Sequence, residues 1–246
     1  RDTQDALTPT RYTVTVTVIA VIATLTIATA AALITPRAGG TGGALGTGAE
    51  RAGEPRFRAD TKRITGQVRR RITGSSWRRG CPVPRSKLRL IRATHWDFER
   101  EVEWGAVIVN RNHKRRIVRV LRELFEERFP IRKMDLIDRY GADDHRSMNA
   151  DNTSAFNCRY VNGTTRWSMH AYGKAIDVNP IENPYVTSGG YVSPPAGEPY
   201  ADRSRRARGM IHHGDSTWDA FRDAGWEWAG DWSGTRDYQH FSANGR

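Results

Sequence analysis

His170 and Asp177 stand seven residues apart in a stretch that begins at Ser168, and imidazole and carboxylate are both ligands that zinc accepts. On one continuous helix their backbones would be separated by roughly 10 Å along the axis, too far for an ion whose ligand atoms lie about 2 Å away. The chain must therefore turn back between the two residues. Gly173 offers that reversal, because glycine tolerates a positive φ. The spacing predicts two ligands of a zinc site.

A catalytic zinc site needs a third protein ligand and an open position for water. His240 is the best candidate for that ligand, because Asp237 lies three residues before it. From that place Asp237 is expected to act as a general base toward water on the metal, whose pKa the ion lowers to about 7. The alternative for His240 is a hydrogen-bonded core histidine packed beside Phe241.

The elements that must position these residues are strands and helices without regular alternation. Alternating apolar residues over 175–179 predict a strand with Ile176 facing the core and Asp177 facing the site. Further strands are expected over 87–92, 106–109 and 131–137.

Two helices are expected from apolar residues at three- and four-residue steps. The first lies within 112–129 and ends before Pro130, and the second covers 216–224 and ends at Gly225. Residues 141–152 are polar and typical of a loop. Because strands and helices do not alternate, an α+β fold is favoured over a doubly wound sheet.

The N-terminal part has the composition of a targeting segment. Residues 12–36 contain no charged side chain, and about 20 apolar residues suffice to cross a bilayer. We expect residues 1–36 to be a signal peptide or a transmembrane anchor, 37–63 a Gly/Ala-rich flexible linker, and 64–246 the folded domain. The predicted location is extracytoplasmic, either secreted or anchored to the membrane.

The chain has two cysteines, Cys81 and Cys158, whose spacing fits no CxxC motif. In an exported protein a disulfide between them is expected, and closing this loop would stabilise the fold by up to roughly 4 to 5 kcal/mol. Two separate buried thiols are the alternative.

The formal net charge of +12 predicts an anionic partner or surface. Nucleic acid is not expected, because the arginines are scattered and accompany no nucleic-acid-binding motif. Anionic cell-wall polymers or a membrane surface suit an exported protein better, and a solvated basic surface without a specific partner is the alternative. We expect a monomer.

Two motifs of this sequence resemble those of the zinc D-alanyl-D-alanine carboxypeptidase family. The first is S-x-H-x-x-G-x-A-x-D over 168–177, and the second is D-x-x-H-F over 237–241. The family includes vancomycin-resistance-type D,D-carboxypeptidases and phage L-alanyl-D-glutamate endopeptidases, and it shares its fold with hedgehog signalling domains. The resemblance covers roughly 76–242.

The resemblance implies a single hedgehog/DD-peptidase-like domain with a small antiparallel sheet flanked by helices. It implies Zn²⁺ on His170, Asp177 and His240, with Asp237 as the base. It also implies that Arg159 contacts the substrate or the developing oxyanion, for which a guanidinium is well suited. An ordinary ion pair is the alternative for Arg159. Ser168 is expected to form a hydrogen bond within the site and to take part in substrate binding rather than to act as a nucleophile.

Aromatic residues surround the second motif, and Trp228 is expected to line a peptide-binding cleft. The predicted function is that of a zinc metallopeptidase cleaving peptidoglycan stem peptides at a D-amino-acid bond. The carboxypeptidase branch usually carries glutamate where this chain has Asp237, so an L-alanyl-D-glutamate-type endopeptidase is the alternative. A non-catalytic, metal-stabilised cell-wall-binding module is an alternative of another class, and Asp237 argues against it.

Overall fold

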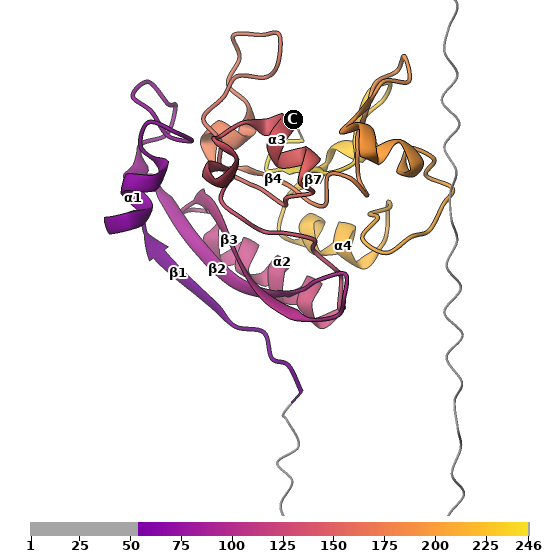
Figure 1. Ribbon diagram of the computed structural model, residues 1–246, viewed down its shortest axis with the longest axis horizontal. Coiled ribbons are helices and arrows are strands. Elements are labelled where there is room, and N and C mark those ends of the chain that lie inside the picture. Colours follow the sequence, from indigo (N-terminus) through magenta and orange to yellow (C-terminus); the bar gives the residue numbers. More distant parts are fainter. Residues whose placement is uncertain (1–53, 246) are drawn as a thin grey trace, which may run out of the picture. The chain divides into compact units, whose positions relative to one another are not determined.

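The protein is described by a computed structural model that covers residues 54–245 (Figure 1). The expected signal peptide or anchor over 1–36, and most of the expected linker, lie outside these residues. Within 54–245 no helix has both the length and the apolar character needed to span a bilayer.

The longest strands form a three-stranded antiparallel sheet in the order β1-β2-β3. Its strands are β1 (Ala59–Arg63), β2 (Leu88–Trp96) and β3 (Val102–Asn110). The strands predicted over 87–92 and 106–109 are thus confirmed. The linker prediction was wrong at its C-terminal end, because 59–63 pairs with β2. This strand is polar and mostly exposed, so its backbone pairing left no apolar pattern to detect.

Helix α2 (Lys114–Glu126) packs against this sheet and against α4 (Ser216–Asp223), and both confirm predicted helices. The buried face of α2 carries Ile117, Val120, Leu121, Leu124 and Phe125, which is the expected amphipathic pattern. Asp215 caps α4, since its carboxylate accepts a hydrogen bond of 2.8 Å from the Trp218 N–H.

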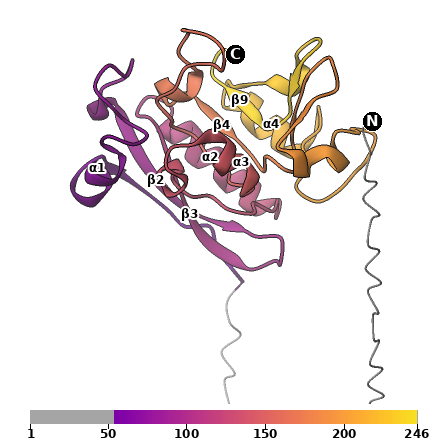
Figure 2. The same cartoon turned by 45° about the horizontal axis from the view of Figure 1, so that its top comes forward.

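Two smaller antiparallel sheets occupy the C-terminal half. One has the order β4-β9-β7, with β4 (Ala175–Asp177), β9 (His240–Ser242) and β7 (Glu227–Trp228), and Figure 2 shows β4 beside β9. The other has the order β6-β5-β8, with β6 (Val192–Ser193), β5 (Tyr185–Val186) and β8 (Arg236–Asp237). All pairings between these named strands are antiparallel, which confirms the α+β class.

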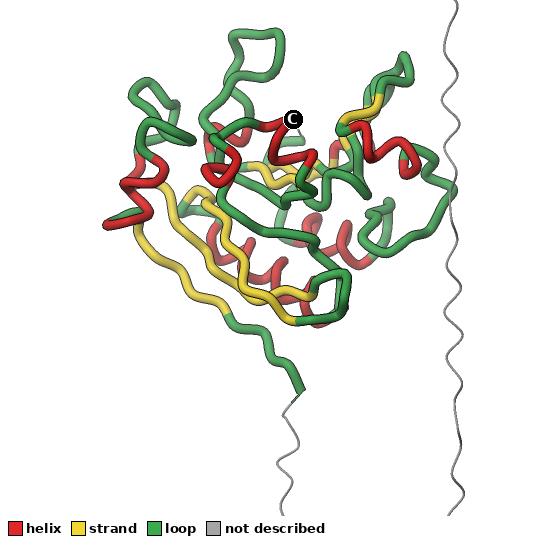
Figure 3. The backbone as a smooth tube through the Cα atoms, viewed as in Figure 1, coloured by secondary structure: helices red, strands yellow, loops and turns green. Residues whose placement is uncertain are grey.

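Long loops and short helices connect these elements (Figure 3). The α-helices α1 (Gly66–Ile72) and α3 (Asp144–Asn149) were not predicted. The 3-10 helices are η1 (Arg85–Lys87), η2 (Ile137–Tyr140), η3 (Met169–Tyr172), η4 (Pro195–Tyr200) and η5 (Ala229–Asp231).

Two segments differ from their predictions for local reasons. In place of the strand predicted over 131–137, residues 131–136 are irregular with one isolated bridge at Lys133, and Ile137 begins η2. The apolar side chains of 131–137 pack into the core without a strand ladder. The loop predicted over 141–152 contains α3, because the Asp143 carboxylate accepts a 2.9 Å hydrogen bond from the Arg146 N–H and caps the helix.

Cys81 and Cys158, the pair that the sequence predicts, form a disulfide. It joins the loop after α1 to the segment that leads into the second half of the domain. A second group of buried apolar residues, including Ile72, Leu88 and Phe156, packs around it.

Candidate metal centre

Ser168 and Gly173 bracket the short helix that presents His170. The Ser168 hydroxyl accepts a 3.3 Å hydrogen bond from the His170 N–H and caps η3. Gly173 ends η3 with φ of 65°, and a Cβ there would lie 2.7 Å from the Asn110 nitrogen. The predicted reversal at Gly173 is therefore confirmed, and both the positive φ and the close approach require glycine.

Asp177 and His240 lie directly opposite each other on β4 and β9. Cross-strand partners of an antiparallel pair place their side chains on the same face of the sheet. The neighbouring pair, Ile176 and Phe241, is buried in the main core. This register brings together two residues that are 63 positions apart.

The three predicted ligands meet in one buried cluster. The Nε2 atom of His170 lies 3.1 Å from Asp177 Oδ2, and His240 Nδ1 lies 2.9 Å from Asp177 Oδ1. The two facing ring nitrogens are 3.2 Å apart. Ligand atoms about 2 Å from a common tetrahedral ion are separated by about 3.3 Å, so this donor set fits one zinc ion. Within 54–245, no other group of three such residues has this arrangement.

The protein fixes the tautomer of His170 through its backbone. The Nδ1 atom lies 2.5 Å from the carbonyl oxygen of Ala155, which can only accept a hydrogen bond. Nδ1 therefore carries a proton, and Nε2, which faces Asp177, is the ring nitrogen that could bind a metal. Ser154, next to Ala155, exchanges two backbone hydrogen bonds with Asp177, so one segment supports both ligands.

Electrostatics keep Asp177 ionised. Burial alone would raise its pKa, but the adjacent His170 and His240 outweigh burial and hold the pKa of Asp177 well below its ordinary value. A buried carboxylate that stays charged at neutral pH is the form that binds a metal cation.

Asp237 lies on β8, opposite Tyr185 of β5. Its carboxylate interacts electrostatically with His170, Asp177 and His240. Burial is the main cause that raises the pKa of Asp237 to about 6; His240 opposes this shift and the charge of Asp177 adds to it. Its Oδ1 atom is buried and has no hydrogen-bond partner among the described residues. A carboxylate with a pKa near neutrality can both accept and release a proton.

Arg159 is held in an ion pair, the alternative that the sequence left open. Its Nη2 atom lies 2.7 Å from Asp144 Oδ2, on the first turn of α3. Its backbone carbonyl accepts a 3.1 Å hydrogen bond from the Ser168 N–H, so it flanks η3. The Nε atom of Arg159 is buried without a hydrogen-bond partner within 54–245. A contact between Arg159 and a substrate stays a prediction.

Trp228 lies in the core, and its role in lining a peptide-binding cleft stays a prediction. It is buried in the main core, and its indole N–H donates a 2.7 Å hydrogen bond to the Tyr238 carbonyl. The β7-β9 register explains this position, because it pairs Trp228 with the core residue Phe241. The aromatic side chain beside the metal cluster is Trp232, whose ring centroid lies 6.2 Å from that of His240.

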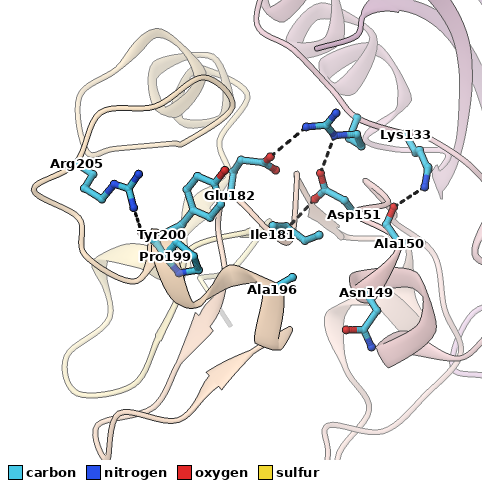
Figure 4. A pocket seen from close by; sticks show the side chains of 11 residues that line it. Lys133, Asn149, Ala150, Asp151, Ile181, Glu182, Ala196, Pro199, Tyr200 and Arg205 are labelled. Carbon is cyan, nitrogen blue, oxygen red and sulfur yellow. Dashed lines mark hydrogen bonds and ion pairs between the residues drawn. The ribbon is translucent and has the colours of Figure 1, made fainter. Parts of the chain in front are cut away.

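A separate cavity of about 520 Å³ lies between the end of α3 and η4, and none of the three metal-ligand candidates lines it (Figure 4). Within it, Arg132 lies 3.5 Å from Asp151 Oδ2 and 3.6 Å from Glu182 Oε1. Burial, reinforced by Asp151, raises the pKa of Glu182 to about 8. This cluster was not predicted from the sequence, since its members are far apart and form no motif.

Fold and site together define an α+β protein with a buried His-Asp-His cluster that could hold a metal ion and a carboxylate, Asp237, of raised pKa. Residues 162–243 match the family model described as D-alanyl-D-alanine carboxypeptidase, about a third of the chain. Over this segment the match supports the resemblance stated from the two motifs, and it supports a peptidase. The matched segment contains the three ligand candidates and Asp237 but not Arg159. Comparisons with curated proteins and with solved structures gave no significant match.

Proposed function

We propose that the protein is a zinc-dependent peptidase that cleaves peptidoglycan stem peptides at a D-amino-acid bond, as a D-alanyl-D-alanine carboxypeptidase does. The observation that carries this proposal is the convergence of His170, Asp177 and His240 within 3.2 Å of one another. The family match over 162–243 also supports it.

Zinc is the metal that this donor set favours. Imidazole and carboxylate ligands suit Zn²⁺, and catalytic zinc sites use three protein ligands. When bound, zinc polarises the scissile carbonyl and lowers the pKa of water to about 7. The hydrogen bond from His170 to Ala155 and the pairing of Asp177 with Ser154 hold two ligands in place before the metal binds.

Asp237 is the proposed general base. Its raised pKa suits a group that takes a proton from the attacking water and gives it to the leaving amine. Arg159 is the proposed contact for a substrate carboxylate or the oxyanion, because a guanidinium binds such groups with two parallel hydrogen bonds. This role requires Arg159 to exchange its ion pair with Asp144 for a contact with substrate.

An L-alanyl-D-glutamate-type endopeptidase is the second candidate, because position 237 is aspartate rather than the glutamate usual in carboxypeptidases. Aspartate is one methylene shorter, which changes how far the base reaches. The position of the cut in a stem peptide distinguishes the two activities.

The test is incubation of the full chain with a stem pentapeptide ending in D-Ala-D-Ala and with purified peptidoglycan, followed by mass spectrometry. Release of one alanine identifies a carboxypeptidase, and a cut after L-alanine identifies the endopeptidase. A chelator should abolish either product, and added zinc should restore it. The absence of any product with zinc bound would favour the non-catalytic wall-binding module.

The proposed location is outside the cytoplasm, secreted or anchored. The disulfide between Cys81 and Cys158 supports it, because disulfides persist in oxidising compartments. The uncharged stretch over 12–36 is the proposed export signal. Fractionation of cells with an antibody to the folded domain tests this location.

A further inference from the structure

Arginines occur throughout the sequence, but nearly all of the excess of positive over negative charge arises in one stretch of the fold. Residues 61–96 contain eleven Lys or Arg residues and no Asp or Glu, against a net charge of +12 for the whole chain. This stretch runs from the end of β1 through α1 and η1 to the end of β2. Figures 1 and 2 both show α1 at the outer edge of the domain.

Several of these cations already have partners within the protein. Lys62 and Arg92 lie 4.0 Å and 3.7 Å from Asp60, and Arg85 stacks 4.1 Å from the Trp77 ring centroid. Arg78 donates a 2.5 Å hydrogen bond to the Cys158 carbonyl.

Six others are exposed, with no ion pair or side-chain hydrogen bond within 54–245. We call them the basic surface, and they are Arg63, Arg69, Arg70, Arg71, Arg79 and Lys87. Side chains of one sign without counter-charges create a positive potential that attracts anions. Nothing inside the described domain neutralises these six.

A disulfide and hydrogen bonds link the part of the chain that carries the basic surface to the segment that contains Arg159. The disulfide ties Cys81, two residues after Arg79, to Cys158, the neighbour of Arg159. The Cys158 N–H also donates a 2.9 Å hydrogen bond to the Ser76 carbonyl, and the Ser76 hydroxyl donates a 2.8 Å hydrogen bond to Asp138. A polymer held on the basic surface would therefore stay at a fixed position relative to the peptidase site.

We propose that the basic surface binds a phosphate-rich, soluble polyanion of the cell wall, of the polyol-phosphate class. The disulfide favours a partner outside the cytoplasm over nucleic acid. A lipid bilayer is less suited, because helices that dock on membranes also insert large apolar side chains. The exposed large hydrophobic residues of the described domain are Trp104, Tyr160 and Tyr191, all outside 61–96. Only the identity of the polymer rests on the proposed function; the cationic surface itself does not.

The experiment measures binding of the full chain, kept in a non-ionic detergent, to purified poly(glycerol phosphate) by biolayer interferometry. The test variant is Arg69→Gln/Arg70→Gln/Arg71→Gln on α1. Glutamine has nearly the helix propensity of arginine, so the fold is retained. The matched control is Lys114→Gln/Arg115→Gln/Arg119→Gln on α2, which removes the same charge from a helix that also carries Glu123 and Glu126.

The α1 variant should lose on the order of 100-fold in affinity, since each cation near an anionic surface contributes a factor of about five. The α2 control should change affinity less than about threefold, and wild-type binding should weaken steeply between 50 and 200 mM salt, by about 10³-fold if all six cations engage phosphates. Equal losses in both variants, or no binding at low salt, would overturn the proposal. So would equally strong binding to phosphatidylglycerol vesicles, which would identify a membrane partner.

Hydrolysis of a soluble stem peptide is measured on the same preparations. The α1 variant should hydrolyse it at the wild-type rate, because the basic surface is separate from the metal cluster. If the wild type binds the polymer but cuts no peptide, the proposed function fails while the docking surface stands. If the wild type cuts the peptide but does not bind the polymer, the docking surface fails while the proposed function stands.

Discussion

Asp177 of the metal cluster and Glu182 of the cavity are both buried acids beside positively charged or ionisable groups, yet their pKa values shift in opposite directions. Asp177 has His240 at 2.9 Å and His170 at 3.1 Å, and its pKa falls. Glu182 has Arg132 at 3.6 Å and a second acid, Asp151, beside it, and its pKa rises to about 8.

The difference shows which of the two buried carboxylates is suited to bind a metal. Near its histidines Asp177 keeps its charge, and two ring nitrogens point with it toward one place. Burial and the neighbouring Asp151 raise the pKa of Glu182, which favours its protonated, uncharged form at neutral pH. Burial and acidic residues are common to both regions, and only the first offers three converging lone pairs.

The largest expected effect comes from removing the carboxylate of the metal cluster. Asp177→Ala should lower zinc affinity by more than about 100-fold. This loss exceeds the loss caused by mutating residues that only hydrogen-bond to metal ligands. Peptidase activity should disappear with the metal. The matched variant in the cavity, Glu182→Gln, should keep zinc at the wild-type level. Zinc content by inductively coupled plasma mass spectrometry checks both, and equal loss in both variants would remove the distinction between the regions.

The next effect concerns the base. Asp237→Asn should lower kcat by roughly 10² to 10⁴-fold, the usual contribution of a general base. Zinc content should be unchanged, because Asp237 is not one of the three converging ligands. Steady-state kinetics together with zinc analysis on one preparation measures this. A variant with full activity would show that another group takes the proton.

The two acids should also give opposite pH profiles of stability in metal-free protein. Because the pKa of Glu182 is raised in the folded state, its contribution is fully present below about pH 4.5 and is lost as pH rises through about 8. Glu182→Gln should therefore flatten the profile between pH 5 and 8.5, by a few kcal/mol. Denaturant unfolding monitored by tryptophan fluorescence measures the profile, with the exposed Glu198→Gln as control.

Asp177 should act on the acid side of the same profile. Its folded-state pKa is lowered, so its contribution is present above its unfolded pKa of about 3.9 and is lost as pH falls below that value. Asp177→Asn should reduce the loss of stability between about pH 5 and pH 2. If Asp177 and Glu182 both changed stability over the same pH range, their pKa values would not be shifted in opposite directions.

The smallest effect is expected from the cap of η3. Ser168→Ala removes the acceptor for the His170 N–H and should cost about 1 kcal/mol of stability. Zinc affinity should fall by about 10-fold, because His170 loses part of its support. Ser168→Thr keeps the hydroxyl and should restore most of the affinity. Isothermal titration with zinc distinguishes the two variants.

The sequence predicted those parts of the site that depend on local chemistry. Glycine at 173 was needed for a reversal between two ligands, and the structure uses it with a positive φ of 65°. The amphipathic helices were found because their apolar faces repeat along the chain. The meeting of Asp177 with His240 depends on strand register over 63 residues, and two motifs were needed to anticipate it.

Other features depend on long-range packing that no local pattern encodes. Trp228 and Trp232 stand four residues apart in similar surroundings, yet one is core and the other lies beside His240. The polar strand β1 is stabilised by its pairing with β2 rather than by an apolar face. The Arg132 cluster joins residues from three separate segments, and Ala155 supports His170 through a backbone carbonyl that any residue type would supply.

The most direct test of the account is to measure zinc stoichiometry and peptide hydrolysis together in the wild type, Asp177→Ala and Asp237→Asn. We expect one zinc and turnover in the wild type, one zinc without turnover in Asp237→Asn, and neither zinc nor turnover in Asp177→Ala. Stoichiometric zinc and undiminished hydrolysis in Asp177→Ala would contradict the assignment of His170, Asp177 and His240 as the metal centre.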